Sequence, residues 1–103
     1  MRKIAQIVDW IDDEIDGSEQ YAHAAMQAKE ANDMESSREY CDMARQELAH
    51  ADILHDMVVR EIRKSEQGDV EVPKGMMEIW EWKHDKYIDR VAKAMIILDM
   101  CKQ

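Results

Sequence analysis

The stretch "RQELAHADILHD", residues 45–56, places Glu47 and His50 where a helix would be expected to carry apolar side chains. It lies within a longer pattern in which large hydrophobic residues recur at helical steps: Tyr40, Met43, Leu54, Met57, Val58 and Ile62. Such spacing is typical of one face of an amphipathic helix, and that face normally packs against a core. The carboxylate and the imidazole therefore interrupt a face that the helix should bury.

The same periodicity predicts two further helices. One apolar stripe comprises Ile4, Ile7, Val8, Ile11, Ile15, Ala22 and Met26, and the other comprises Met77, Trp80, Ile88, Val91, Met95 and Leu98. Between the stripes, "NDME" at 32–35 has the spacing of a helix N-cap at Asn32. "SEQGDVEVPKG" at 65–75 breaks the pattern again, and Pro73 suits a helix start. We predict helices over about 2–31, 34–65 and 75–101.

Short connections between long helices favour antiparallel neighbours. The sequence therefore predicts a single all-α domain over residues 1–103, an antiparallel bundle of three long helices. The composition agrees, because the chain has three glycines, one proline and no phenylalanine, and 46% of its residues are hydrophobic. This balance is typical of long packed helices rather than of a turn-rich sheet or a disordered chain.

Charge and segment length exclude several classes of partner. A net charge of −9 argues against nucleic acid, whose phosphates need a basic surface. No apolar run approaches the length of a membrane span, and "MRKIAQIVDW" at 1–10 lacks the apolar core of a secretion signal. We expect a cytoplasmic protein in which Cys41 and Cys101 are reduced thiols. A glycine-rich phosphate loop, an HExxH motif and a Cys/His zinc cluster are all absent from the sequence.

A third polar residue, Glu19, interrupts the first stripe between Ile15 and Ala22. If the first two helices fold back about residue 33, Glu19 lies 14 residues before the turn (33 − 19) and Glu47 lies 14 after it (47 − 33). Glu19, Glu47 and His50 would then meet at one level of the bundle. Unpaired carboxylates are costly to bury, and a divalent cation would compensate them. The alternative is that these groups face solvent, or that Glu47 pairs with a basic residue.

Two more histidines are candidate ligands. His23 lies four residues after Glu19, so it could join the same cluster or serve as a structural hydrogen-bonding residue. Glu81 and His84 form a second pair with the ExxH spacing, and folding about residue 70 brings them near His55, roughly 12 Å along the bundle from the first cluster. They are either a second cation site or a salt-bridged surface pair with Lys83 and Lys86.

Glu19 followed by "ELAH" at 47–50 resembles the ferritin-like superfamily, in particular its half-size members of the encapsulated-ferritin type. The resemblance covers about residues 1–66. It implies a homodimer or larger symmetric oligomer that rebuilds a four-helix bundle around two iron ions, held by Glu19, Glu47 and His50 of each copy. It further implies ferroxidase activity, the oxidation of Fe(II) by O₂ or peroxide. Manganese or zinc could occupy the same ligands.

The third predicted helix lies outside that resemblance. Its sequence "EIWEWKHDKYIDRVAKAMIILDM", residues 78–100, resembles small helical proteins of unassigned role encoded among phage and prophage structural genes. That resemblance implies a non-enzymatic interaction or structural protein in which the same polar residues set helix register. Both functions stay open from the sequence.

Overall fold

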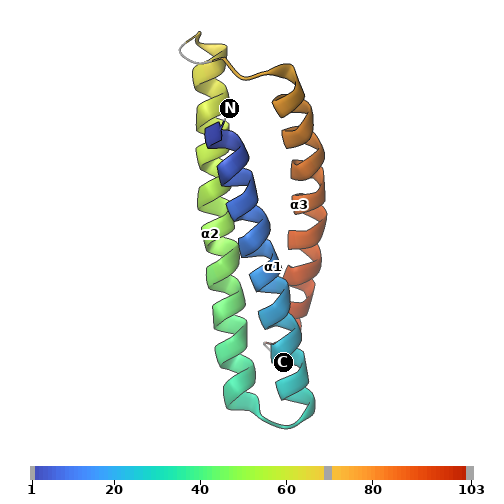
Figure 1. Cartoon of the computed structure of the whole chain (residues 1–103). Coiled ribbons are helices and arrows are strands. Elements are labelled where there is room, and N and C mark those ends of the chain that lie inside the picture. Colours follow the sequence, from blue (N-terminus) through green and yellow to red (C-terminus); the bar gives the residue numbers. More distant parts are fainter. Residues whose placement is uncertain (1, 69–70, 102–103) are drawn as a thin grey trace.

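The computed structural model describes residues 2–68 and 71–101, and within these ranges it contains helices and no strand. The helices are α1 (Arg2–Glu30), α2 (Met34–Glu66) and α3 (Lys74–Met100) (Figure 1). Each predicted boundary lies within one residue of the observed one. The prediction of an all-helical bundle with three long helices is confirmed.

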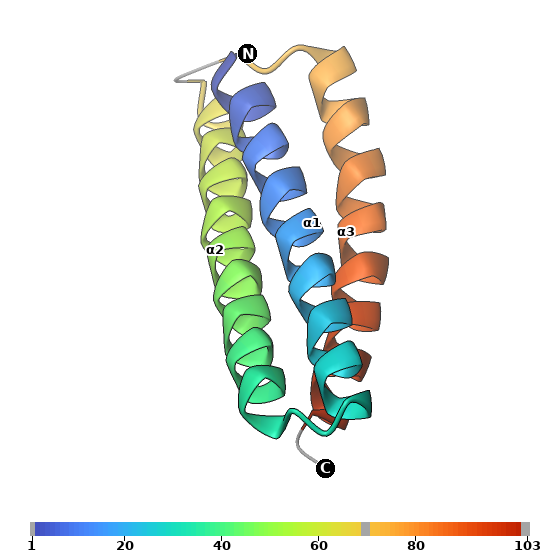
Figure 2. The same cartoon turned by 60° about the horizontal axis from the view of Figure 1, so that its bottom comes forward.

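The three helices form an elongated bundle of 55 × 18 × 18 Å. Helices α1 and α2 form an antiparallel hairpin. Helix α3 is antiparallel to α2 and has the same direction as α1, so that the end of α3 lies beside the α1–α2 turn (Figures 1 and 2). Helix α1 packs against both of the others, whereas α2 and α3 touch each other little. The central position of α1 explains why its apolar stripe is the most completely buried of the three.

The core changes character along the bundle. One half is filled by large side chains of α1, which meet Ala51 and Val58 of α2 and Trp80 and Tyr87 of α3; the α1 residues are Ile4, Ile7, Val8, Ile11 and Ile15. Burying each such isoleucine contributes roughly 1.5–3 kcal/mol. The other half contains small residues (Ala22, Ala25 and Ala44) together with Cys41 and Leu98. There the hydroxyl of Ser37 donates a hydrogen bond of 2.9 Å to the carbonyl oxygen of Ala25.

The turn between α1 and α2 corrects one prediction. Asn32 has a positive φ of 62° and follows the end of α1, a position that asparagine tolerates better than most residues. Asp33 is the N-cap of α2, and its carboxylate accepts a hydrogen bond of 3.1 Å from the Ser36 N–H. The predicted N-cap at Asn32 is therefore wrong by one residue. Pro73 stands directly before α3, in agreement with the sequence.

A disulfide joins Cys41 of α2 to Cys101 after α3, with the two Cα atoms 6.7 Å apart. The prediction of two reduced thiols is therefore wrong. The physical reason is that α3 folds back beside the start of α2 and brings together residues separated by 60 positions. Disulfides persist mainly in oxidising compartments, so this bond argues against the predicted cytoplasmic location. The location itself stays a prediction. Among the described residues, none of the helices has the length and apolar character needed to cross a membrane.

Candidate metal centre

Glu47 and His50 of α2 come together with Glu14 of α1. One ligand atom from each of the three side chains lies within 4.8 Å of the other two. The ExxH spacing explains the α2 half, because residues three apart share one face of a helix. The α1 half comes from Glu14, whose Oε2 lies 3.4 Å from the Nδ1 of His50. We call Glu14, Glu47 and His50 the carboxylate–histidine cluster.

The cluster is partly buried and incompletely satisfied. The Glu14 side chain is 26% exposed and that of His50 is 58% exposed. The Oε2 atom of Glu14 is itself buried, and no described donor makes a hydrogen bond to it. At 3.4 Å, the contact with His50 is an ion-pair distance rather than a good hydrogen bond. A buried oxygen without a donor is unfavourable, and a bound cation would satisfy it.

Crowding of the two carboxyl groups changes the protonation of Glu47. Glu14 raises the pKa of the Glu47 carboxyl above its usual value, chiefly through a hydrogen bond between the two groups; burial adds to the rise, and charge repulsion from Glu14 adds to it further. His50 opposes this effect when it carries a positive charge. A hydrogen bond between two carboxyl groups requires that one of them be protonated. The pair therefore favours a shared proton or a cation between its oxygens.

Gly17 makes room for the cluster. A Cβ atom at this position would lie 3.2 Å from the Cδ and 3.3 Å from the Oε2 of Glu47. The carboxylate of α2 thus rests against the backbone of α1, one helical turn beyond Glu14. Glycine in a helix interior costs about 1 kcal/mol relative to alanine. Glycine at position 17 therefore lowers helix stability, but it allows the Glu47 side chain to approach α1 more closely than any other residue at this position would.

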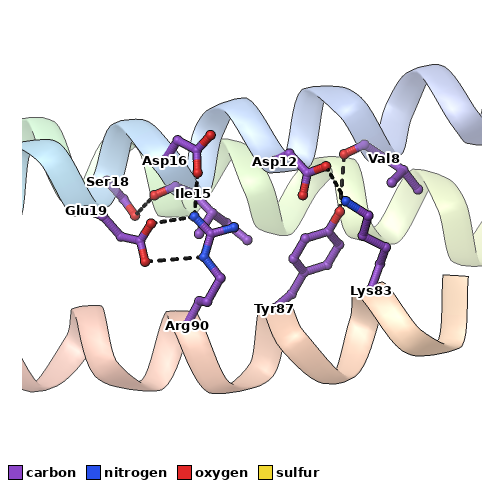
Figure 3. Close-up of polar contacts among 9 residues, drawn as sticks. All are labelled: Val8, Asp12, Ile15, Asp16, Ser18, Glu19, Lys83, Tyr87 and Arg90. Carbon is purple, nitrogen blue, oxygen red and sulfur yellow. Dashed lines mark hydrogen bonds and ion pairs between the residues drawn. The ribbon is translucent and has the colours of Figure 1, made fainter. Parts of the chain in front are cut away.

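Glu19, the predicted α1 ligand, lies instead at the interface between α1 and α3. Its carboxylate accepts hydrogen bonds from Nε and Nη2 of Arg90 on α3, with a distance of 3.2 Å for Nε to Oε2, and Arg90 also pairs with Asp16 (Figure 3). These carboxylates, Glu19 foremost, raise the pKa of the Arg90 guanidinium. The prediction that Glu19 meets Glu47 and His50 is therefore wrong for the folded chain.

The same interface continues along α1 and α3. The Nζ of Lys83 lies 2.8 Å from a carboxylate oxygen of Asp12, and the hydroxyl of Tyr87 donates a hydrogen bond of 3.2 Å to the carbonyl of Val8 (Figure 3). Burial, reinforced by Asp12, raises the pKa of the Tyr87 hydroxyl. Asp12 and Asp16 each lie two residues from Glu14, which places Glu14 about 160° around α1 from both of them. Helix α3 therefore covers the opposite side of α1 from the carboxylate–histidine cluster.

The remaining predicted ligands fall outside the cluster. His23 is exposed and shares a shallow hollow on α1 with Asp16 and Glu19. Glu81 is exposed as well, while Lys83 pairs with Asp12 and Lys86 lies over the Trp82 ring at 4.5 Å. His84 lies beside His55, as folding about residue 70 predicts, with 3.1 Å between their Nε2 atoms.

Sequence reasoning missed Glu14, although a signal for it exists. Glu14 stands seven residues after Ile7 and seven before Tyr21, and both of these contribute to the core. A helical repeat of seven residues returns to nearly the same face. Glu14 is therefore the polar member of a mostly apolar row, and Gly17 three residues later is a second sign of close packing there.

The fold and the site together define an all-helical bundle with two carboxylates and one imidazole gathered on the α1–α2 seam. Comparison with models of known protein families, with curated proteins and with solved structures found no match. The resemblance to the ferritin-like superfamily stays a prediction, and the function is argued from the site itself.

Proposed function

We propose that this protein binds a divalent transition-metal ion through Glu14, Glu47 and His50. The observation that carries the proposal is the crowding of the Glu14 and Glu47 carboxylates beside an imidazole, with a buried Glu14 oxygen that has no hydrogen-bond donor in good geometry. The basic residues Lys83 and Arg90 neutralise other carboxylates on the far side of α1. A cation would supply the positive charge that this cluster lacks. Two hard oxygen ligands and one imidazole suit iron or manganese, and zinc can compete for them.

The proposed site is completed by a second copy of the chain. Three protein ligands leave part of the coordination sphere of a metal ion open, on the side where His50 is half-exposed. Trp10 and Met43 lie one helical turn before Glu14 and Glu47, and they are 44% and 36% exposed. Exposed aromatic and methionine side chains are enriched in protein interfaces relative to the rest of the surface. We expect a two-fold axis near the cluster, so that two copies contribute two metal ions per dimer.

Ferroxidase chemistry is the activity that this arrangement fits best. Fe(II) is the substrate, and O₂ or peroxide is the oxidant. In the dimer, two copies of Glu14 and Glu47 provide four carboxylates, and anionic oxygen ligands stabilise the more highly charged Fe(III). Glu47 gives up the proton that it shares with Glu14 when the metal binds. His50 supplies a neutral nitrogen ligand at the exposed side, where the oxidant can approach.

The alternative is a non-enzymatic interaction protein, and one observation favours it. Helix α3 carries large apolar side chains that are half or more exposed at Ile79, Trp82 and Ile96. These positions follow helical steps, so they lie along one outward face of α3. Exposed apolar faces of this kind mark protein contacts. This surface is separate from the cluster, so a partner on α3 is compatible with metal binding on the α1–α2 seam.

Calorimetric titration with Mn²⁺, which binds like Fe(II) but does not react with O₂, tests the proposal. Wild-type protein should bind about one ion per chain. A Glu14→Gln/Glu47→Gln variant should lose this binding, whereas Glu19→Gln should retain it, because Glu19 is paired with Arg90. Retained binding in the double variant would show that the metal is held elsewhere. Fe(II) oxidation in air should be lost in the same double variant and kept in Glu19→Gln.

A further inference from the structure

A histidine pair bridges α2 and α3, the two helices that otherwise make little contact. The Nε2 atoms of His55 and His84 lie 3.1 Å apart, and the two rings are inclined by 24°. The ring of Trp80 stacks against that of His84 at 5.2 Å between centroids and lies 5.7 Å from that of His55. The two imidazoles are therefore held facing each other at the rim of a pocket of about 380 Å³ between the helices.

Asp56 determines which nitrogen of His55 is available. The Nδ1 of His55 lies 3.2 Å from Oδ1 of Asp56. An ionised carboxylate only accepts hydrogen bonds, so Nδ1 carries the proton and the Nε2 of the neutral ring keeps a lone pair, which accepts a hydrogen bond from the Nε2–H of His84 in the metal-free protein. That lone pair is directed toward His84. The same arrangement, with a carboxylate behind the histidine, orients and strengthens histidine ligands in metal sites.

The separation of the two nitrogens suits a single metal ion. With metal–nitrogen bonds of about 2.0–2.1 Å, two imidazole nitrogens on one ion lie about 2.9 Å apart at a right angle and about 3.4 Å apart in a tetrahedron. The observed 3.1 Å lies between these values. Rotation of the rings about their broad χ2 torsions can turn both lone pairs toward one ion without moving the helices.

Two carboxylates of α2 lie beside His55. Asp52 precedes His55 by three residues on α2, and Asp52, His55 and Asp56 each place one ligand atom within 4.8 Å of the others, a group that does not include His84. Asp52 also lines the same pocket as His55 and His84. Imidazole nitrogens bind zinc, copper, iron and nickel, and the general order of divalent-metal affinities places copper and zinc above iron(II) and manganese. His55 lies five residues after His50, about 140° around α2, so this pair faces a different side of the bundle from the carboxylate–histidine cluster.

We propose that His55 and His84 form a second metal site that binds zinc more tightly than iron(II) or manganese, with Asp52 as the neighbouring carboxylate and Asp56 as a positioning residue. The ion would cross-link α2 to α3, which make few other contacts. This site does not depend on the proposed function of Glu14, Glu47 and His50, and either can fail without the other.

Titration of the full-length, metal-free His50→Ala protein with Zn²⁺ alone tests the site, followed by long-range ¹H–¹⁵N spectra of the imidazoles. The Nε2 resonances of His55 and His84 should shift together up to one equivalent, while those of exposed His23 stay in place. Shifts confined to other histidines, or no shift at all, would overturn the proposal.

Substitutions separate ligands from packing residues. His84→Gln keeps much of the volume and a hydrogen-bonding group, and it should weaken Zn²⁺ binding at least tenfold, whereas His23→Ala should not. Asp56→Asn should change the tautomer of His55 in the metal-free spectra and weaken binding by a smaller factor. Unchanged Zn²⁺ affinity in a folded His84→Gln protein would show that the pair is only a hydrogen bond between two rings.

Discussion

Replacement of Gly17 by alanine should raise stability and weaken metal binding at the same time. Gly17 lies inside α1, where alanine is favoured over glycine by roughly 0.5–1 kcal/mol. The new Cβ would stand 3.2 Å from Cδ and 3.3 Å from Oε2 of Glu47. These atoms end a flexible side chain, so Glu47 can yield by a few tenths of an ångström at little cost. For a chain of this size we expect the melting temperature of the metal-free protein to rise by about 3–6 °C.

Metal binding should change in the opposite direction. Metal–ligand distances in well-formed sites lie within about 0.2 Å of their usual values, and the added methyl group displaces the Glu47 carboxylate from its place beside Glu14 and His50. We expect Mn²⁺ affinity to fall about tenfold, equivalent to about 1.4 kcal/mol. Thermal unfolding by circular dichroism and calorimetric titration measure the two effects. Gly75→Ala is the matched control, because no atom lies within 4 Å of the added Cβ, and it should leave metal affinity unchanged. Wild-type affinity in Gly17→Ala would refute the role given to this glycine.

Three further perturbations test other parts of the molecule. Cys41→Ser/Cys101→Ser should reduce the free energy of unfolding in urea by about 4 kcal/mol, the chain-entropy value for a loop of this length, and a loss below about 1 kcal/mol would mean that the bond does not form in solution. Metal-free wild-type protein should lose stability as pH rises from the usual glutamate pKa of 4.5 to the raised pKa of Glu47, because the folded state holds a proton there that the unfolded state releases. Glu47→Gln should flatten that part of the pH profile, and an unchanged slope would contradict the coupling with Glu14. Arg90→Gln should cost about 1 kcal/mol through the partly exposed ion pair with Glu19 and leave Mn²⁺ affinity intact; loss of metal binding would show that the two seams are coupled.

Helical periodicity predicted the fold well, because it depends on local spacing. The apolar stripes predicted three helices whose ends agree with the structure. The N-cap of α2 was assigned one residue too early, to Asn32, because asparagine suits both an N-cap and the left-handed position after a helix. The cysteine pairing could not be predicted in the same way. A disulfide depends on the distance between the two cysteines and on the directions of both Cβ atoms, which are set by how α3 packs beside α2.

The candidate site was predicted in part. The sequence placed Glu47 and His50 on the buried face of α2, whereas in the structure Glu47 is half-buried and His50 is exposed at the edge of the α1–α2 interface. Counting residues from a turn gives the level of a side chain along the bundle but not the side of the helix on which it lies. Glu19 has the expected level, yet it faces α3 and meets Arg90, whereas Glu14 faces α2. The distinction depends on how α1 is rotated between its two neighbours, which only the packing of all three helices determines.

Native mass spectrometry of untagged protein loaded with Fe(II) without oxygen tests the central claim most directly, because it counts chains and metal ions together. The proposal predicts a dimer that carries two iron ions in the wild type and in Glu19→Gln. It predicts no bound iron in Glu14→Gln/Glu47→Gln. A wild-type monomer without iron under these conditions, or iron bound equally by the double variant, would contradict the assignment of Glu14, Glu47 and His50 as a metal site.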